Sequence, residues 1–226
     1  FIKVHDMNKF DDCEFCSLKD GSEPTLPRDL QLLCTERLQQ NLMYDGAEFY
    51  LKPDISPVVK GHLLIIPKKH YFSILSLPIK DLEELNLIKQ KIIDFYAKEN
   101  KLCLFFEHGC CGETDTGSSC IHHAHLHSIP ISLDDGRNIM REAIRLLGMP
   151  NTNMAEVENS TYLFMEIAGS SSLYWKDLIM RSQFFRILIS ETFGEFQRSR
   201  WQNCIINEKE RLKSEIWLKE LRNVKL

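Results

Sequence analysis

The segment 121–130 constrains the fold of this chain more than any other, because it holds a row of histidines. His123, His125 and His127 alternate with small or apolar residues. A period of two is typical of a β-strand, so we expect these imidazoles to share one face of a sheet, roughly 7 Å apart. His122 is out of phase and is expected on the other face. An imidazole can act as a nucleophile, a proton carrier or a metal ligand, so the row indicates a chemical site rather than an exposed polar strand.

The composition is typical of a soluble globular protein. Of the 226 residues, 43% are hydrophobic and 27% are charged. The formal net charge of -4 argues against electrostatic binding of nucleic acid. No apolar run approaches the roughly 20 residues of a membrane helix, and the eight cysteines include the close pair Cys13 and Cys16, so we expect a reduced, cytoplasmic protein. The first residue is Phe1 rather than methionine, as expected of a trimmed or incomplete N-terminus.

Cys13 and Cys16 form a C-x-x-C pair, the spacing at which two thiolates can bind one tetrahedral zinc. A redox pair has the same spacing, but it would favour a following amphipathic helix. Residues 17–28 are polar and contain Gly21, Pro24 and Pro27, which disfavour a helix. The sequence therefore favours zinc, with two further ligands, which we expect to be histidines, elsewhere in the chain.

Short strands and amphipathic helices make up the rest of the pattern, which predicts an α+β protein. Strands are expected at 41–44, 48–52, 61–67, 102–106, 162–167 and 173–175. Helices are expected at 77–100, 137–147, 182–193 and 206–224. A turn at 134–136 should separate the histidine strand from the second helix.

Two loops are candidates for ligand contact. Residues 53–57 form a rigid polar corner, where Asp54 either hydrogen-bonds its own backbone or contacts a ligand. Residues 110–119 are mostly small or polar, and such a loop can present backbone N–H groups to an anion.

Two separated motifs resemble those of the histidine-triad (HIT) superfamily. The first is His123-x-His125-x-His127, and the second is the upstream run from Asp54-Ile55-Ser56-Pro57 through Gly61-His62 to Pro67-Lys68-Lys69-His70. The resemblance spans residues 13–130 and implies an antiparallel sheet with flanking helices. It also implies that the protein binds a nucleotide and cleaves at the α-phosphate, by hydrolysis or by nucleotidyl transfer.

The resemblance implies a role for each matching residue. His125 corresponds to a nucleophile that forms a covalent nucleotidyl intermediate, His127 to the residue that hydrogen-bonds the phosphate and leaving group, and His62 to a histidine flanking the site. Asp54 corresponds to the acid that accepts hydrogen bonds from the ribose. Ser119 and Cys120 occupy loop positions that contact phosphate. Glu107 is the further candidate for substrate binding, where many relatives carry an amide; a carboxylate there would repel the substrate unless it is protonated or turned away.

Zinc-containing members of the superfamily use a C-x-x-C and two histidines. The corresponding residues here are Cys13, Cys16, His70 and His123. Such a closed set leaves no coordination position for water, which implies a structural zinc.

We expect a HIT-like catalytic domain at 1–133 and an α+β C-terminal extension at 134–226 packed on it. The extension resembles that of longer members, and it would complete a second sheet, cover the nucleotide, form a homodimer or serve only for packing. The expected partner is a nucleotide substrate, without membrane or nucleic acid.

The leading hypothesis is hydrolysis of a nucleoside phosphoramidate or a dinucleoside polyphosphate. It is favoured by His127, because transferase and phosphorylase branches usually carry glutamine there. The alternatives are a nucleotidyltransferase or phosphorylase, a zinc-dependent hydrolase that uses the histidine row as metal ligands, and a non-enzymatic nucleotide sensor or partner-binding module.

Overall fold

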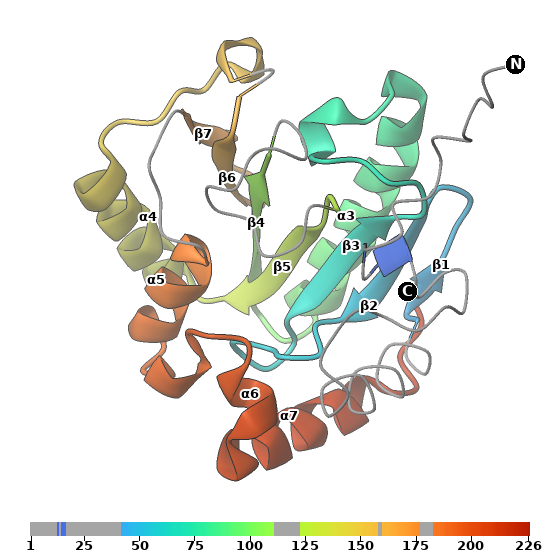
Figure 1. Cartoon of the computed structure of the whole chain (residues 1–226), viewed down its shortest axis with the longest axis vertical. Coiled ribbons are helices and arrows are strands. Elements are labelled where there is room, and N and C mark those ends of the chain that lie inside the picture. Colours follow the sequence, from blue (N-terminus) through green and yellow to red (C-terminus); the bar gives the residue numbers. More distant parts are fainter. Residues whose placement is uncertain (1–12, 14, 17–41, 111–122, 158–159, 177–182) are drawn as a thin grey trace, which may run out of the picture.

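The computed structural model describes residues 13, 15–16, 42–110, 123–157, 160–176 and 183–226. Seven antiparallel strands form one sheet in the order β1-β2-β3-β5-β4-β6-β7 (Figure 1). The strands are β1 (Tyr44–Asp45), β2 (Phe49–Pro53), β3 (Leu63–Pro67), β4 (Leu102–Gly109), β5 (Leu126–Ile131), β6 (Tyr162–Ile167) and β7 (Leu173–Lys176). The predicted α+β class is confirmed.

Helix α3 (Leu82–Ala97) covers one face of the sheet and lies behind it in Figure 1. Its buried residues, Leu85, Ile88, Ile92 and Tyr96, recur at three- and four-residue spacing, which places them on one side of a helix. They pack against sheet residues of this face, including Leu63, Phe105 and Leu126. Helix α3 is shorter than the helix predicted at 77–100, because two 3₁₀ turns, η1 (Ile74–Ser76) and η2 (Ile79–Asp81), precede it.

Helices α4 (Leu133–Leu147) and α5 (Phe184–Thr192) cover the other face near β4 and β6, at the left of Figure 1. Ile139 and Ala143 of α4, and Phe185 and Ile189 of α5, share a core with sheet residues such as Leu104. The catalytic candidates belong to this same face, because His127 pairs in register with Phe106 of this second core.

Helix α4 begins four residues earlier than the sequence pattern indicated. The expected turn at 134–136 is wrong, because these residues form the first turn of the helix. Ser132 is the N-cap: its hydroxyl accepts the Asp135 N–H (3.1 Å), and the Asp135 carboxylate accepts the Ser132 N–H (3.0 Å). This reciprocal capping box satisfies two backbone donors that a helix start otherwise leaves unpaired.

The C-terminal segment belongs to the same sheet. Strand β6 pairs with β4 over six residue pairs, and β7 pairs with β6, so these strands extend the sheet instead of forming a second one. After α5, the chain runs through η4 (Phe196–Arg198), α6 (Asn203–Ile206) and α7 (Glu208–Leu221). Its end returns to the region before β1, where the Leu226 N–H donates to the Met43 carbonyl (2.9 Å; Figure 1).

A turn before β3 sets the position of His62. Gly61 has a φ of +89°, a left-handed conformation that favours glycine, and its carbonyl accepts the Tyr96 hydroxyl of α3 (2.7 Å).

None of the helices that the structure describes is long and apolar enough to cross a membrane.

Candidate functional site

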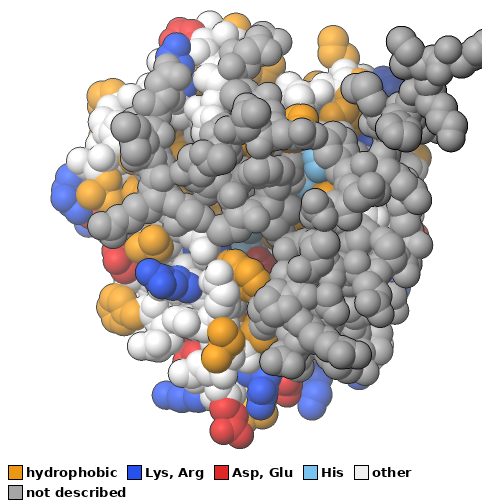
Figure 2. Space-filling view, in the orientation of Figure 1, with side chains coloured by type: hydrophobic (Ala, Val, Ile, Leu, Met, Phe, Trp, Pro, Cys, Tyr) orange, Lys and Arg blue, Asp and Glu red, His pale blue; other side chains and the backbone are white. Residues whose placement is uncertain are grey.

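The histidine row is only partly a strand. His127 lies in β5, whereas His123 and His125 precede this strand, which begins at Leu126. The rings of His125 and His127 are adjacent, with centroids 4.8 Å apart, while His123 contacts the ring of His70 at 4.9 Å. The row therefore contributes to two neighbouring clusters, and histidine atoms are visible near the middle of the face in Figure 2.

The first cluster contains Cys13, Cys16, His70 and His123. Their possible ligand atoms all lie within 4.8 Å of one another. Cys13 Sγ is 3.3 Å from His123 Nδ1, and Cys16 Sγ is 3.4 Å from His70 Nδ1 and 3.6 Å from His123 Nδ1. Sulfur and nitrogen ligands of one tetrahedral zinc stand about 3.6 Å apart, as follows from Zn–S and Zn–N lengths of about 2.3 and 2.0 Å. The cluster could bind such a metal.

The protonation of this cluster also fits a metal. His123 Nε2 lies 2.8 Å from the Pro67 carbonyl oxygen, which can only accept, so Nε2 carries the proton and Nδ1 has a free lone pair. A hydrogen bond from the Cys16 side chain lowers the pKa of the Cys13 thiol to about 2 against the effect of burial. A thiolate and a neutral imidazole are the forms that bind zinc.

His125 presents the opposite nitrogen. Its Nδ1 lies 2.7 Å from the His123 carbonyl oxygen, so Nδ1–H donates and Nε2 carries the lone pair. Burial lowers the pKa of His125, which keeps the ring neutral near pH 7. Phe15 packs edge-on against this ring at 5.5 Å. A neutral imidazole with one nitrogen fixed by a carbonyl and the other unprotonated can act as a nucleophile.

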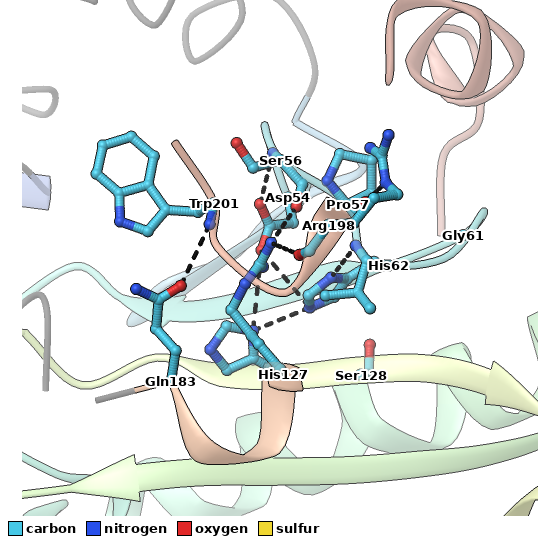
Figure 3. A network of polar contacts seen from close by, with 12 residues as sticks. Asp54, Ser56, Pro57, Gly61, His62, His127, Ser128, Gln183, Arg198 and Trp201 are labelled. Carbon is cyan, nitrogen blue, oxygen red and sulfur yellow. Dashed lines mark hydrogen bonds and ion pairs between the residues drawn. The ribbon is translucent and has the colours of Figure 1, made fainter. Parts of the chain in front are cut away.

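His62 and His127 form a hydrogen-bonded pair (Figure 3). The Val58 N–H donates to His62 Nδ1 (3.2 Å), so His62 holds its proton on Nε2 and donates it to His127 Nδ1 (2.9 Å). His127 therefore carries its own proton on Nε2. Its ring stacks on Phe106, with centroids 4.6 Å apart and planes within 1° of parallel. The arrangement presents one fixed N–H donor at this position.

Burial holds both of these rings neutral. It lowers the pKa of His62 to about 4 and that of His127 well below its ordinary value, with His125 as a further cause for His127. The nearby Asp54 carboxylate opposes the shift at His62 without cancelling it. A neutral imidazole has one donor and one acceptor nitrogen. The hydrogen bonds from Val58 to His62 and from His62 to His127 therefore keep one direction at neutral pH.

Asp54 lies beside this pair and is almost fully buried, with 6% of its surface exposed. Its Oδ1 accepts the Ser56 N–H (2.7 Å), and its Oδ2 faces His62 Nε2 at 3.6 Å and His127 Nδ1 at 3.9 Å. Arg186 Nη1 approaches the same Oδ2 at 3.3 Å. The Arg186 guanidinium and the hydrogen bond from the Ser56 N–H lower the pKa of Asp54 against the effect of burial, so it is ionised.

Glu107 is on β4 but is not brought together with the histidines. Its neighbour Phe106 shares the His127 face, so Glu107 projects to the opposite face. There its carboxyl accepts hydrogen bonds from the Tyr162 hydroxyl and from the Ile74 N–H (2.9 Å). Burial raises the pKa of Glu107 to about 7, and these two donors oppose the shift. Ser119 and Cys120 lie outside the described residues.

The raised pKa makes Glu107 a source of pH-dependent stability. An ordinary glutamate ionises near pH 4.5, whereas Glu107 in the native state ionises near pH 7. Its contribution is fully present below pH 4.5 and is lost as the pH rises to 7, a change of about 3 kcal/mol. We expect Glu107→Gln to remove this decline, measured as the free energy of unfolding in urea from pH 4.5 to 7.5.

The exposed Glu83 of α3 offers a matched control, because Glu83→Gln should leave the pH dependence of the parent unchanged. A Glu107→Gln protein whose stability still falls across this pH range as steeply as that of the parent would contradict the interpretation of Glu107.

Arg186 and Arg198 are polar residues of the site region that the sequence analysis missed. Arg198 is fully buried and donates to the Pro57 carbonyl (2.7 Å) of the same corner that holds Asp54. A signal was present, since Arg186 follows two phenylalanines in an apolar helix, and a buried arginine needs a partner. That signal does not identify the partner.

Comparisons with known proteins agree with the motifs. A family model described as "Protein similar to CwfJ C-terminal" matches residues 33–145. The zinc finger CCCH domain-containing protein 59 of Oryza sativa subsp. japonica is 24% identical over 188 residues, which cover 74% of this chain and 29% of that protein. An uncharacterised HIT-like protein of Mycobacterium tuberculosis is 25% identical over 118 residues, which cover 52% of this chain and 70% of the relative. The chain thus spans less than a third of the rice protein.

Solved structures of HIT proteins also align with this chain. A hypothetical histidine triad nucleotide-binding protein from Sulfolobus tokodaii is 26% identical and covers 54% of this chain and 70% of its own, with a TM-score of 0.36. A HIT family protein from Bacillus anthracis is 22% identical and covers 60% of this chain and 95% of its own, with a TM-score of 0.39. The family model covers half of the 226 residues, so the chain belongs to the family of proteins similar to the CwfJ C-terminus, within the histidine-triad superfamily.

Proposed function

We propose that this protein binds a nucleotide and cleaves it at the α-phosphate through a covalent intermediate on His125. The observation that supports this most strongly is the hydrogen bond between His125 Nδ1 and the His123 carbonyl, which leaves Nε2 unprotonated. The M. tuberculosis relative is named a HIT-like protein, and nucleotides are the substrate class that the resemblance to the HIT superfamily implies. The substrate is a nucleoside phosphoramidate or a dinucleoside polyphosphate.

The first step is attack of His125 Nε2 on the α-phosphorus. A bond forms between nitrogen and phosphorus, the bond from phosphorus to the leaving group breaks, and the leaving group departs with the bonding electron pair. His127 donates its Nε2–H to the phosphate or to the leaving group. Its ring is held for this by the hydrogen bond from His62 and by stacking on Phe106.

Water completes the reaction by attacking the phosphorus and displacing His125 Nε2, and the proton that water loses replaces the one given to the leaving group. The products are a nucleoside monophosphate and the free imidazole. In a transferase or phosphorylase, an acceptor other than water would take this second step. His127 favours water in our proposal, because those branches of the superfamily usually carry glutamine at the third triad position.

We propose a structural role for zinc bound by Cys13, Cys16, His70 and His123. All four positions of a tetrahedral ion would be filled by protein, so the ion would hold the N-terminal segment against β3 and the residues before β5. The ion supplies no chemistry to the reaction in this proposal. Its effect on catalysis is indirect, through the position of His123, whose carbonyl orients His125.

A catalytic metal in the second histidine cluster is the alternative. Asp54, His62 and His127 place possible ligand atoms within 4.8 Å of one another. However, His62 donates directly to His127, and the Arg186 guanidinium is 3.3 Å from the Asp54 carboxylate. A fixed positive charge next to the carboxylate disfavours a divalent cation, so the nucleophilic mechanism is the better supported function.

Trapping the intermediate tests the proposal. The chain is mixed for short times with adenosine 5′-phosphoramidate or diadenosine polyphosphate, quenched, and analysed by intact mass and peptide mapping. We expect an adenylyl adduct on His125, and in ¹⁸O-labelled water we expect label in the released nucleoside monophosphate. An adduct on another residue would contradict the assignment of the nucleophile, and an unlabelled product with a second acceptor bound would identify a transferase.

A further inference from the structure

The Asp54 carboxylate is almost fully buried and lies next to Ser56, His62 and His127 (Figure 3). Its Oδ1 accepts the Ser56 N–H, and its Oδ2 faces the Arg186 guanidinium at 3.3 Å. The remaining side of Oδ2 faces the edges of His62 and His127, at 3.6 and 3.9 Å. A carboxylate has about four lone-pair sites. Two of them accept from Ser56 and Arg186, and the others are buried with the carboxylate, which exposes only 6% of its surface.

Arg186 is held in place as firmly as Asp54. Only 6% of its surface is exposed, and its Nη2 donates to the Ser56 carbonyl (2.7 Å) and the Arg198 carbonyl (3.3 Å). These contacts join α5 and η4 of the C-terminal segment to the corner that contains Asp54. Moving Arg186 would therefore break one buried ion pair and two hydrogen bonds to backbone carbonyls.

Arg198 anchors this arrangement from behind. It donates to the Pro57 carbonyl, to the Glu210 carboxylate (2.8 Å) and to the Ser214 hydroxyl (2.6 Å), and its guanidinium lies over the Trp217 ring at 4.6 Å. A continuous set of polar contacts thus runs from α7 through Arg198 and Arg186 to the histidine pair. The corner is fixed by residues far from it in the sequence.

We propose that Arg186 is a specificity-determining residue that occupies Asp54, so that this site does not select nucleotides by their ribose hydroxyls. Acidic side chains in nucleotide sites commonly accept hydrogen bonds from ribose. Here that role would require Asp54 to release Arg186 and to leave a buried guanidinium without its counter-ion. Breaking a buried ion pair costs more than one hydrogen bond to a carboxylate contributes, so the ion pair prevails.

The consequence is a broader class of ligand. The site accepts nucleoside 5′-monophosphates with or without the 2′- and 3′-hydroxyls. Asp54 instead faces His62 and His127, at 3.6 and 3.9 Å. This inference rests on the nucleotide-binding part of the proposed function, and it does not depend on hydrolysis.

Binding of two matched nucleotides to the full chain tests the inference. Adenosine 5′-monophosphate and its 2′,3′-dideoxy counterpart are titrated in a calorimeter, and the ratio of their dissociation constants is measured. We expect a ratio within about threefold. A site in which a carboxylate accepts the ribose hydroxyls would lose roughly tenfold to hundredfold in affinity for the dideoxy nucleotide, and such a loss in the native chain would overturn the inference.

Arg186→Met removes the guanidinium and retains much of the side-chain volume. We expect this variant to prefer the ribonucleotide by roughly tenfold, because Asp54 becomes able to accept a ribose hydroxyl. The exposed Arg200, in the same segment, is the control, and Arg200→Met should keep the ratio of the native chain. A folded Arg186→Met protein that still shows no preference would overturn the role of Arg186.

The native ratio decides the question even if Arg186→Met does not fold, which a thermal melt would show. A native chain that binds neither nucleotide also overturns the inference. A chain that binds both equally and hydrolyses no nucleotide supports the inference and contradicts only the proposed hydrolysis.

Discussion

His125→Ala is expected to lower kcat for a nucleoside phosphoramidate by roughly 10³-fold or more, because the variant has no atom to form the bond to phosphorus. Nucleotide affinity should change little, since the variant retains His127, the proposed hydrogen-bond donor to the phosphate, and the hydrogen bond from His62 that orients it. The measurements are steady-state turnover and calorimetric binding of the nucleoside monophosphate. Covalent labelling by the substrate should also disappear from the intact mass spectrum.

Lys101 provides a control for this substitution. It is exposed, precedes β4 and lies outside the hydrogen-bonded pair of His62 and His127 and outside the cysteine cluster. We expect Lys101→Ala to retain turnover within about threefold of the parent, and the two variants should have similar melting temperatures. Turnover by His125→Ala at the parent rate would refute the proposed nucleophile.

Cys13→Ser is expected to lower zinc content and thermal stability together. Cys13 is buried, and its sulfur is 3.3 Å from His123 Nδ1, so a weaker ligand at this position opens the metal site. Loss of a structural metal costs several kcal/mol, which corresponds to a fall of about 10 °C in melting temperature for a chain of this size. The measurements are metal analysis of the purified protein and a thermal melt with and without a chelator.

Cys110→Ser is the control, because Cys110 is a buried cysteine that hydrogen-bonds the Phe72 carbonyl, which serine can also do. It should keep the zinc content of the parent. Chelation separates the two metal hypotheses. Removal of a structural zinc lowers stability first, whereas removal of a catalytic zinc would abolish turnover at once in protein that is still folded. Immediate loss of activity without loss of structure would contradict the structural role.

Periodicity in the sequence predicted most of the fold. The strand predicted at 162–167 and the helical spacing of Leu85, Ile88 and Ile92 both correspond to elements of the structure. The boundaries were less certain, because a helix start depends on hydrogen bonds at its ends. At α4, the Ser132–Asp135 capping box outweighed the turn tendency of the Asp-Asp-Gly run. The division of the chain at residue 133 stays a prediction, and strands from both sides of it form one sheet.

The site was partly predictable for a related reason. The motifs that carry the histidines and cysteines are short, and the structure brings Cys13, Cys16, His70 and His123 together as one cluster. Periodicity could not predict the separate roles within the row. The ring nitrogen that carries the proton is determined by the carbonyl that each imidazole contacts, and these contacts are tertiary or local hydrogen bonds. A carbonyl fixes His125 and another fixes His123, but they leave opposite nitrogens free.

The sequence by itself determined the α+β class, the order of the elements and the residue types available for chemistry, because these follow from patterns among neighbours in the chain. Only the tertiary structure decided that Glu107 faces away from the histidines and that Arg186 occupies Asp54. Arg186 and Asp54 are 132 residues apart, and their contact depends on how α5 packs beside the corner after β2. Local patterns can require that a buried charge has a partner, but three-dimensional packing selects which partner it is.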